Sequence, residues 1–269
     1  MLQRRAVILS CSLIYFCRPR AAMGVPVMPF NIKDPKSVFP DNAAMQALAQ
    51  FVIRDDVQSL AAALARDPSA VDRVGVEGVT LLMVAVVHSS QNSIRVLMKA
   101  GANPHKPASS LSNLGRPASM ALRMRSKPDV FAILVSEGMD LNGGFQGDGE
   151  LLLDIAVLES DDVRLRQILT TGRANPNIGN SVQNTPFLKS IASRQYEKSL
   201  LLMDAGVDPL MGNENPLQMI LKRHQNWDPG SPKLAAVKQL EARLRAMGVT
   251  ETSSVKRAPV RPDNPNPRN

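Results

Sequence analysis

Three histidines and one glycine-rich stretch are the first places to look for chemistry in this sequence. His88, His105 and His224 lie far apart and have no carboxylate at the spacing of a zinc site. The stretch 144–150 (GFQGDGE) lacks the lysine of a phosphate-binding loop and the glycine spacing of a dinucleotide site. We predict surface positions for His88 and His224, and turns for His105 and the glycine-rich stretch.

Two acidic pairs offer the residue type that general acid–base catalysis needs. Asp55-Asp56 and Asp161-Asp162 each precede a predicted helix, where a carboxylate caps free amide groups and faces the positive end of the helix dipole. We therefore predict capping for both pairs. No Ser-His-Asp arrangement can be inferred, so we predict no enzyme and no catalytic, cofactor-binding or metal-binding residue.

The net charge of +8 lies mainly at the two ends of the 269-residue chain. Four arginines stand within the first twenty residues, and the last fifteen residues are also basic. Phosphate binding needs positive charges gathered on one face, so a nearly neutral body argues against a nucleic-acid partner. The few aromatic residues favour packed helices over a β-sandwich or barrel.

The first 24 residues have the pattern of a secretory signal peptide. A basic start (MLQRR) precedes about a dozen apolar residues, too few to span a membrane, and a small-residue end at Ala22. Arg18 and Arg20 oppose export, so a wrongly assigned start or a disordered cytoplasmic leader remains the alternative. Residues 8–11 also resemble a lipoprotein cleavage site, which would make Cys11 a lipid attachment point. Removal of the segment would leave no cysteine, because Cys17 is the last one.

A glycine ends an amphipathic, helix-like run at four places along the chain. These are Gly101, Gly138, Gly172 and Gly206, and the intervals between them are 37, 34 and 34 residues. A glycine in the left-handed conformation closes a helix without a Cβ clash. The regular interval predicts a repeated structural unit.

A helix start follows about a dozen residues after each of these glycines. Thr185-Pro186 and Asn215-Pro216 place a capping oxygen before a proline in the first helical position. Small residues at equivalent places in these helices are expected to let neighbouring helices approach closely. They are Ala85, Ala121, Ala156 and Ser190.

This unit of helix, tight connection, second helix and turn resembles the ankyrin repeat over roughly residues 41–249. Thr80-Leu81-Leu82 and Thr185-Pro186-Phe187 stand where that family has Thr-Pro-Leu, and residues 101–104 (GANP) match its turn. Asn103, Asn142, Asn177 and Asp208 are assigned to the turn position. The family's histidine after Thr-Pro-Leu is absent, which puts histidine bonding between turns in doubt. Tetratricopeptide repeats share the period but lack both motifs.

We therefore predict an all-α ankyrin-repeat solenoid of about six helix-turn-helix units with short turns or fingers between them. The expected organisation is a signal peptide at 1–24, an extended leader at 25–40, the repeat array at 41–249 and a disordered basic, Pro-rich tail at 250–269. The last unit carries an insertion at 224–232 that contains Trp227.

The resemblance implies a protein-binding module, because turns and first helices line the concave face of such arrays. Trp227 either fastens the insertion onto the last repeats or anchors an interface. The candidate partner-binding residues are Glu77, His88, Asn113, Arg123, Arg125, Asp148, Glu159, Gln183, Arg194, Arg223 and Trp227.

The leader and the degenerate repeats also resemble certain bacterial exported ankyrin proteins. Some of those are immunity proteins that bind a lipase or similar toxin of the type VI secretion system. The resemblance implies a periplasmic or secreted protein, monomeric when alone, that occludes such a toxin. The alternatives are a secreted effector, a cytoplasmic adaptor and, from another class, a hydrolase with a concealed site.

Overall fold

The computed structural model describes residues 31–109, 114–124, 129–143, 151–159, 162–180, 182–224 and 232–259. These residues form α-helices and two short 3-10 helices, with no β-strand among them. The predicted signal peptide, the stretch 144–150 and Trp227 lie outside the described residues.

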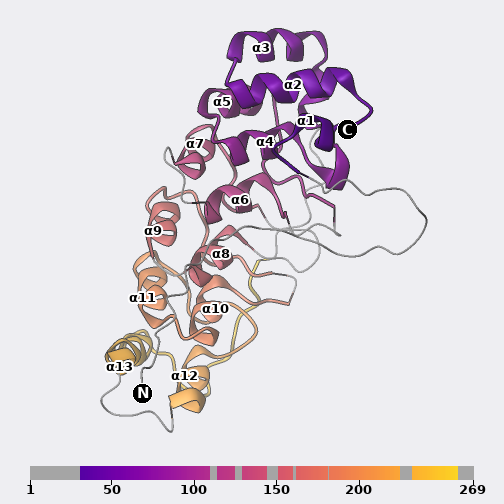
Figure 1. Cartoon of the computed structure of the whole chain (residues 1–269). Helices are drawn as coiled ribbons and strands as arrows, with labels where there is room; N and C mark the ends of the chain where they lie inside the picture. The colour runs from indigo at the N-terminus through magenta and orange to yellow at the C-terminus, as the bar shows by residue number, and fades with distance from the viewer. Residues whose placement is uncertain are drawn as a thin grey trace, which may run out of the picture.

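Twelve of the helices in the described part of the chain form six consecutive pairs, which confirms the expected solenoid. First helices pack on first helices in one row, second helices lie beside them in another, and the rows run the length of the molecule (Figure 1). The first helices are α2 (Ala43–Arg54), α4 (Leu81–His88), α6 (Pro117–Arg123), α8 (Leu152–Leu158), α10 (Pro186–Ala192) and α12 (Pro216–His224). The second helices are α3 (Val57–Arg66), α5 (Gln91–Lys99), α7 (Val130–Ser136), α9 (Val163–Leu169), α11 (Tyr196–Asp204) and α13 (Pro232–Ala246).

The helix boundaries follow the predicted start and stop residues. The Thr80 hydroxyl accepts a hydrogen bond from the Met83 amide, and the Thr185 hydroxyl accepts one from the Leu188 amide, each at 3.3 Å. The glycines after the second helices have positive φ, for example 89° at Gly138 and 82° at Gly206. A Cβ at either glycine would meet no atom within 4 Å, so the backbone conformation, not space, demands glycine.

One continuous apolar core runs between the two rows. The small residues predicted to let first helices approach, Ala85, Ala121, Ala156 and Ser190, are all fully buried. The Ser190 hydroxyl donates to the Phe187 carbonyl at 2.6 Å and also lies 2.7 Å from the Ser199 hydroxyl of α11. These contacts satisfy its polarity inside the core.

Two buried cations tie second helices to the preceding repeat. Arg164 of α9 is 4% exposed and donates to the carbonyls of Leu122 at 3.1 Å and Met124 at 2.8 Å, where α6 ends. Lys198, placed 34 residues later in α11, donates to the carbonyls of Val157 at 2.8 Å and Glu159, where α8 ends. Both cations satisfy carbonyls that have no partner within their own helix and lie at the negative end of its dipole.

The acidic pairs divide between three tasks. Asp56 caps its own helix α3 by accepting the Ser59 amide at 3.1 Å, as predicted. Asp55 caps the next repeat instead, because its carboxylate accepts the Ser93 amide of α5 at 2.7 Å. Asp162 stands before α9 but makes no side-chain cap, so that prediction is wrong; it pairs with Arg166 at 2.7 Å. Asp161 lies outside the described residues.

The segments that flank the array, residues 31–40 and 250–259, differ from two further predictions. Residues 31–40 are not wholly extended, because Asp34 caps the short helix α1 (Pro35–Val38) and Val38 and Phe39 are buried against η2 (Val76–Gly78). The other 3-10 helix, η1, spans Pro68–Asp72. Residues 250–259 are not disordered, because they pair with turns of the array and bury Ala258.

Arg164→Met is expected to destabilise the fold by about 2–3 kcal/mol, because it leaves the carbonyls at the end of α6 without a donor. Arg166→Met in the same helix is the matched control. Arg166 is 58% exposed, and its ion-pair partner in the described part of the chain is Asp162, so its loss should cost less than about 0.5 kcal/mol. Urea unfolding of both variants tests this, and equal losses would contradict the role of Arg164.

Asp55→Asn is expected to reduce the pH dependence of stability. Burial alone would raise the pKa of Asp55, but the hydrogen bonds from Ser93 and Asn92 together outweigh it and lower the pKa. A lowered folded-state pKa contributes stability above the unfolded value, about 3.9, and that stability is lost as the pH falls through the folded value. The variant should therefore be less stable at pH 7 and approach wild type near pH 2. Urea unfolding across this range checks it, with the exposed Asp41→Asn as control.

Candidate protein-binding surface

The turns after the second helices share one local hydrogen bond. An Asn or Asp side chain accepts the amide two residues ahead, which fixes the turn without a partner from another repeat. The accepting residues and distances are Asn103 to His105 at 2.8 Å, Asp140 to Asn142 at 2.9 Å, Asn175 to Asn177 at 2.9 Å and Asp208 to Leu210 at 3.0 Å. The equivalent turn positions are therefore 103, 140, 175 and 208, so the assignment of Asn142 and Asn177 to this position is wrong by two residues.

Asn142 and Asn177 instead form the links between turns. The Asn142 side chain accepts the Asn175 amide at 2.6 Å, and the Asn177 side chain accepts the Asp208 amide at 2.7 Å. The same link joins Asp72 to the Asn103 amide at 2.9 Å. We call this series the turn ladder; sequence reasoning missed it, although the recurrence of Asn at an interval of 35 residues was its signal.

His105 completes the turn ladder where asparagine is absent. Its Nε2 lies 2.8 Å from the Asp140 carbonyl oxygen, which accepts the bond. The imidazole also fills the space beside Gly143, where a Cβ would lie 2.6 Å from the ring. Histidine bonding between turns, which the missing family histidine put in doubt, is therefore present once in the described residues, at a different position.

The candidate residues from the first helices end up in corresponding places. His88, Arg123, Arg194 and Arg223 lie at or just after the carboxyl ends of α4, α6, α10 and α12, and Glu159 does so for α8. Because these helices stack in order, the residues follow one edge of the array. We call them the helix-end row.

Members of the helix-end row differ in exposure. Arg123, Arg194 and Arg223 are exposed. Arg223 donates to the Ala192 carbonyl of the neighbouring α10 at 2.8 Å. His88 is half-buried, and its pKa is lowered by burial first and then by the nearby Lys33 ammonium, which favours a neutral imidazole at pH 7.

The candidate residues from the turns are less available than predicted. Glu77 is half-buried in η2, has φ of 55° and accepts the Ser109 amide on its carbonyl at 2.7 Å. Gln183 is also half-buried, and its side-chain oxygen is enclosed by protein atoms. Asn113, Arg125, Asp148 and Trp227 lie outside the described residues.

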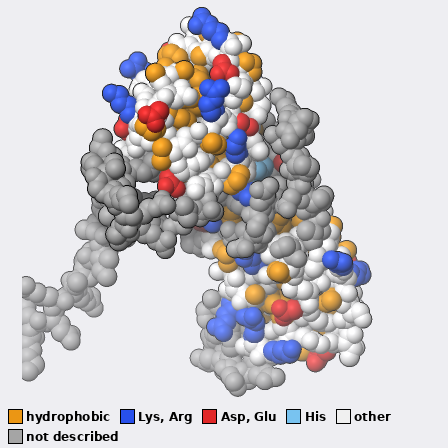
Figure 2. All heavy atoms as spheres, turned by 90° about the vertical axis from the view of Figure 1, so that its right-hand side faces the viewer, with side chains coloured by type: hydrophobic (Ala, Val, Ile, Leu, Met, Phe, Trp, Pro, Cys, Tyr) orange, Lys and Arg blue, Asp and Glu red, His pale blue; other side chains and the backbone are white. Residues whose placement is uncertain are grey.

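Figure 2 shows the side of the molecule that is on the right in Figure 1. Lysine and arginine side chains appear in its upper and lower parts, and in both parts they are mixed with apolar and some acidic side chains. The described part of this face therefore has mixed polarity. Such a surface suits protein recognition better than phosphate binding, which needs one dominant sign of charge.

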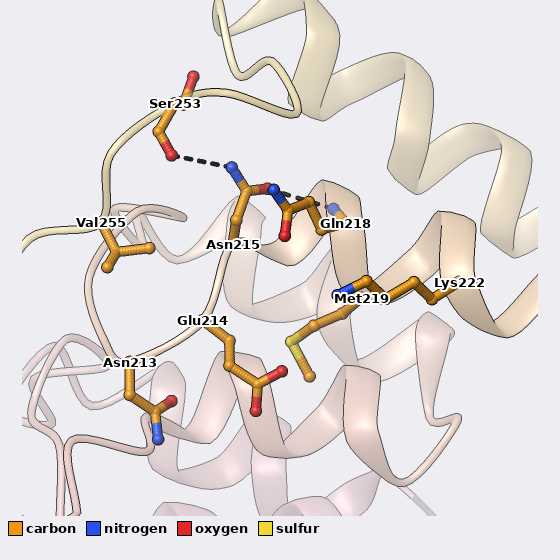
Figure 3. A pocket seen from close by; sticks show the side chains of 8 residues that line it. All are labelled: Asn213, Glu214, Asn215, Gln218, Met219, Lys222, Ser253 and Val255. Carbon is orange, nitrogen blue, oxygen red and sulfur yellow. Dashed lines mark hydrogen bonds between the residues drawn. The ribbon is translucent and has the colours of Figure 1, made fainter.

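A small open cavity of about 310 Å³ lies between the start of α12 and the C-terminal segment (Figure 3). Its lining is mostly polar, and Asn215 is committed to structure: its side chain accepts the Leu217 amide at 3.0 Å and donates to the Ser253 carbonyl at 3.0 Å. The lining residues are Asn213, Glu214, Asn215, Gln218, Met219, Lys222, Ser253 and Val255. They supply hydrogen-bonding groups but no nucleophile paired with a base.

Within the described ranges, no group of three or more His, Cys, Asp and Glu residues is arranged to hold a metal ion. The same part of the chain contains no helix with the length and apolarity needed to cross a bilayer.

No protein-family model matches the sequence, and no curated protein matches it significantly. Solved structures do resemble the fold. The ankyrin repeat domain of Bcl-3, an IkappaB family member, has a TM-score of 0.54 at 17% identity, over 72% of this chain and 83% of that one. An ankyrin repeat domain from Acinetobacter baumannii AYE has a TM-score of 0.54 at 21% identity, over 76% and 98%. The ankyrin repeat protein EF0377 has a TM-score of 0.53 at 20% identity, over 73% and 96%.

The turn ladder gives a test of how neighbouring turns are coupled. Asn177→Ala removes the link to the next turn, whereas Asn175→Ala removes only the bond within its own turn. Each should cost about 1 kcal/mol. Hydrogen exchange of the Asp208 amide should accelerate in Asn177→Ala alone. Equal acceleration in both variants would show that the link between turns does not protect this amide.

Proposed function

Because the chain has the ankyrin-repeat fold, we propose that it is a non-enzymatic module that binds a protein partner through the helix-end row. The observation that carries this proposal is the exposure of Arg123, Arg194 and Arg223 at successive places on a stacked scaffold. Buried hydrogen bonds from Arg164 and Lys198 hold the scaffold behind them. The backbone positions of the three arginines are therefore set before binding, so that binding has to order their side chains but not the scaffold.

The charge of this row defines the kind of surface that would fit it. Three of its members are exposed arginines, whereas Glu159 is its acidic member. Arginine forms bidentate hydrogen bonds with carboxylates and is enriched among the residues that dominate binding energy. The partner should therefore present acidic side chains at a repeat-like spacing.

The specific partner that we propose is a secreted toxin, such as a lipase-type effector of the type VI secretion system. The chain would then be a periplasmic immunity protein. This rests on the signal-like pattern of residues 1–24, on the absence of cysteine after Cys17 and on the likeness in organisation to bacterial exported ankyrin proteins. Inhibition would be steric, with the curved array covering the active site or the membrane-docking face of the toxin.

The test is capture of the partner from native periplasm with the full chain, followed by binding measurements on a double charge reversal. Arg123→Glu with Arg194→Glu should weaken binding at least tenfold, because both exposed cations would face acidic side chains with the wrong sign. Tm should change little, since surface substitutions usually stay within about 0.5 kcal/mol.

The matched control is Lys99→Glu with Lys238→Glu, which makes the same change of net charge on exposed sites of second helices. Its affinity should stay within about twofold of wild type. If the arginine variant binds as tightly as wild type, the interface lies elsewhere. If the captured partner is not a toxin, and the chain gives no protection against one, the immunity assignment is wrong.

A further inference from the structure

The C-terminal segment 255–259 lies across the turns of the two preceding repeats. The Lys256 amide donates to the Leu210 carbonyl at 2.7 Å, and the Gly212 amide donates to the Lys256 carbonyl at 2.9 Å. Farther along, the Gly179 amide donates to the Pro259 carbonyl at 3.1 Å. The two hydrogen bonds of Lys256 form one isolated parallel β-bridge with Met211. An extended peptide that adds to the edge of a β-sheet uses the same kind of main-chain pairing.

Side chains of this segment have alternating roles. The Lys256 ammonium lies 2.7 Å from the Asp208 carboxylate, and both groups keep access to solvent. Ala258, two residues on, is 3% exposed and lies against Gly179, where an added Cβ would be 2.9 Å from the Ala258 methyl group. Arg257, between them, is exposed. The edge therefore selects a basic residue and, two positions later, a small one.

The C-terminal segment is held firmly at residues 250–253 and weakly at residues 255–259. The Asn215 side chain donates to the carbonyls of Thr250 at 2.9 Å and Ser253 at 3.0 Å. Beyond Ser253, Ala258 is the only buried side chain among residues 254–259, and the one ion pair is exposed. Segments with few buried apolar contacts open at low free-energy cost. Residues 255–259 can therefore detach from the turns while residues 250–253 stay bound to Asn215.

We propose that the edge formed by Gly179 and residues 208–212 is a recognition site for an extended peptide segment with a basic residue followed two positions later by a small one. The chain's own residues 256–259 occupy this site and cover it. A partner's segment of the same pattern gains access by displacing them. This inference is independent of the proposed immunity function, because it concerns the turns and not the helix-end row.

Tethering explains why the site stays closed in the isolated chain. A segment held by a short linker competes at an effective concentration of roughly millimolar. A free peptide with the same sequence must overcome this competition, so it should bind the wild-type chain much more weakly than a chain whose own segment has been released.

The experiment uses the full chain and a fluorescein-labelled peptide with the sequence of residues 252–259 (TSSVKRAP). Ala258→Trp in the protein should release the segment, because the indole cannot fit against Gly179. Hydrogen exchange at the Gly179 and Gly212 amides should then accelerate at least tenfold. Fluorescence anisotropy should show peptide binding at least tenfold tighter than to wild type.

Arg257→Ala is the matched control, because this exposed side chain makes none of the contacts that hold the segment; it should behave as wild type. A peptide carrying the tryptophan in place of Ala258 should not bind the released protein. Release without peptide binding would overturn the proposal, and so would equal binding of both peptides. Unchanged protection of Gly179 and Gly212 in Ala258→Trp would show that the segment does not cover the edge.

Discussion

The structure depends on hydrogen bonds between repeats: each repeat supplies partners for backbone amides and carbonyls that have none within their own helix. Helices such as α6 and α8 have seven residues. The first four amides and the last four carbonyls of a helix have no partner within it, so most of the backbone polar groups of these short helices need partners elsewhere. Arg164 and Lys198 supply donors to the ends of these two helices from the next repeat, and Asp55 supplies an acceptor to the start of α5. Short helices persist here because stacking brings these groups within reach.

The sequence was sufficient for the architecture because its signals are local. A glycine that must adopt positive φ and a threonine before a helix act within a few residues, so the period and the helix starts follow directly. The links between repeats are not local. Asn142 and Asn177 each bind an amide more than thirty residues away, and only the stacking geometry distinguishes them from Asn103 and Asn175. This is why the turn position was assigned two residues too late.

The described parts of the two flanking segments, residues 31–40 and 250–259, were mispredicted for a different reason. Residues 250–259 have the polar, Pro-containing composition typical of disorder, which predicts too little apolar burial for folding. They are ordered by main-chain hydrogen bonds to Leu210, Gly212 and Gly179, and such bonds leave no mark in composition. Residues 31–40 carried a clearer signal, since Val38 and Phe39 are apolar and both become buried. An extended conformation was the wrong inference from the prolines alone.

The sequence was sufficient to place the surface residues at helix ends, but not to show which of them are available to bind a partner. Periodicity placed His88, Arg123 and Arg194 at helix ends, yet it could not show that Lys33 approaches His88 or that Arg223 donates to Ala192. Whether a side chain can bind a partner depends on the contacts that it already makes within the fold. Lys198 binds a neighbouring repeat, so its substitution alters the scaffold. Arg194 is exposed, so it can be substituted to suit a partner while the repeats stay stacked. The recognition surface that we propose therefore relies most on exposed side chains such as Arg194, whose substitution leaves the buried contacts between repeats in place.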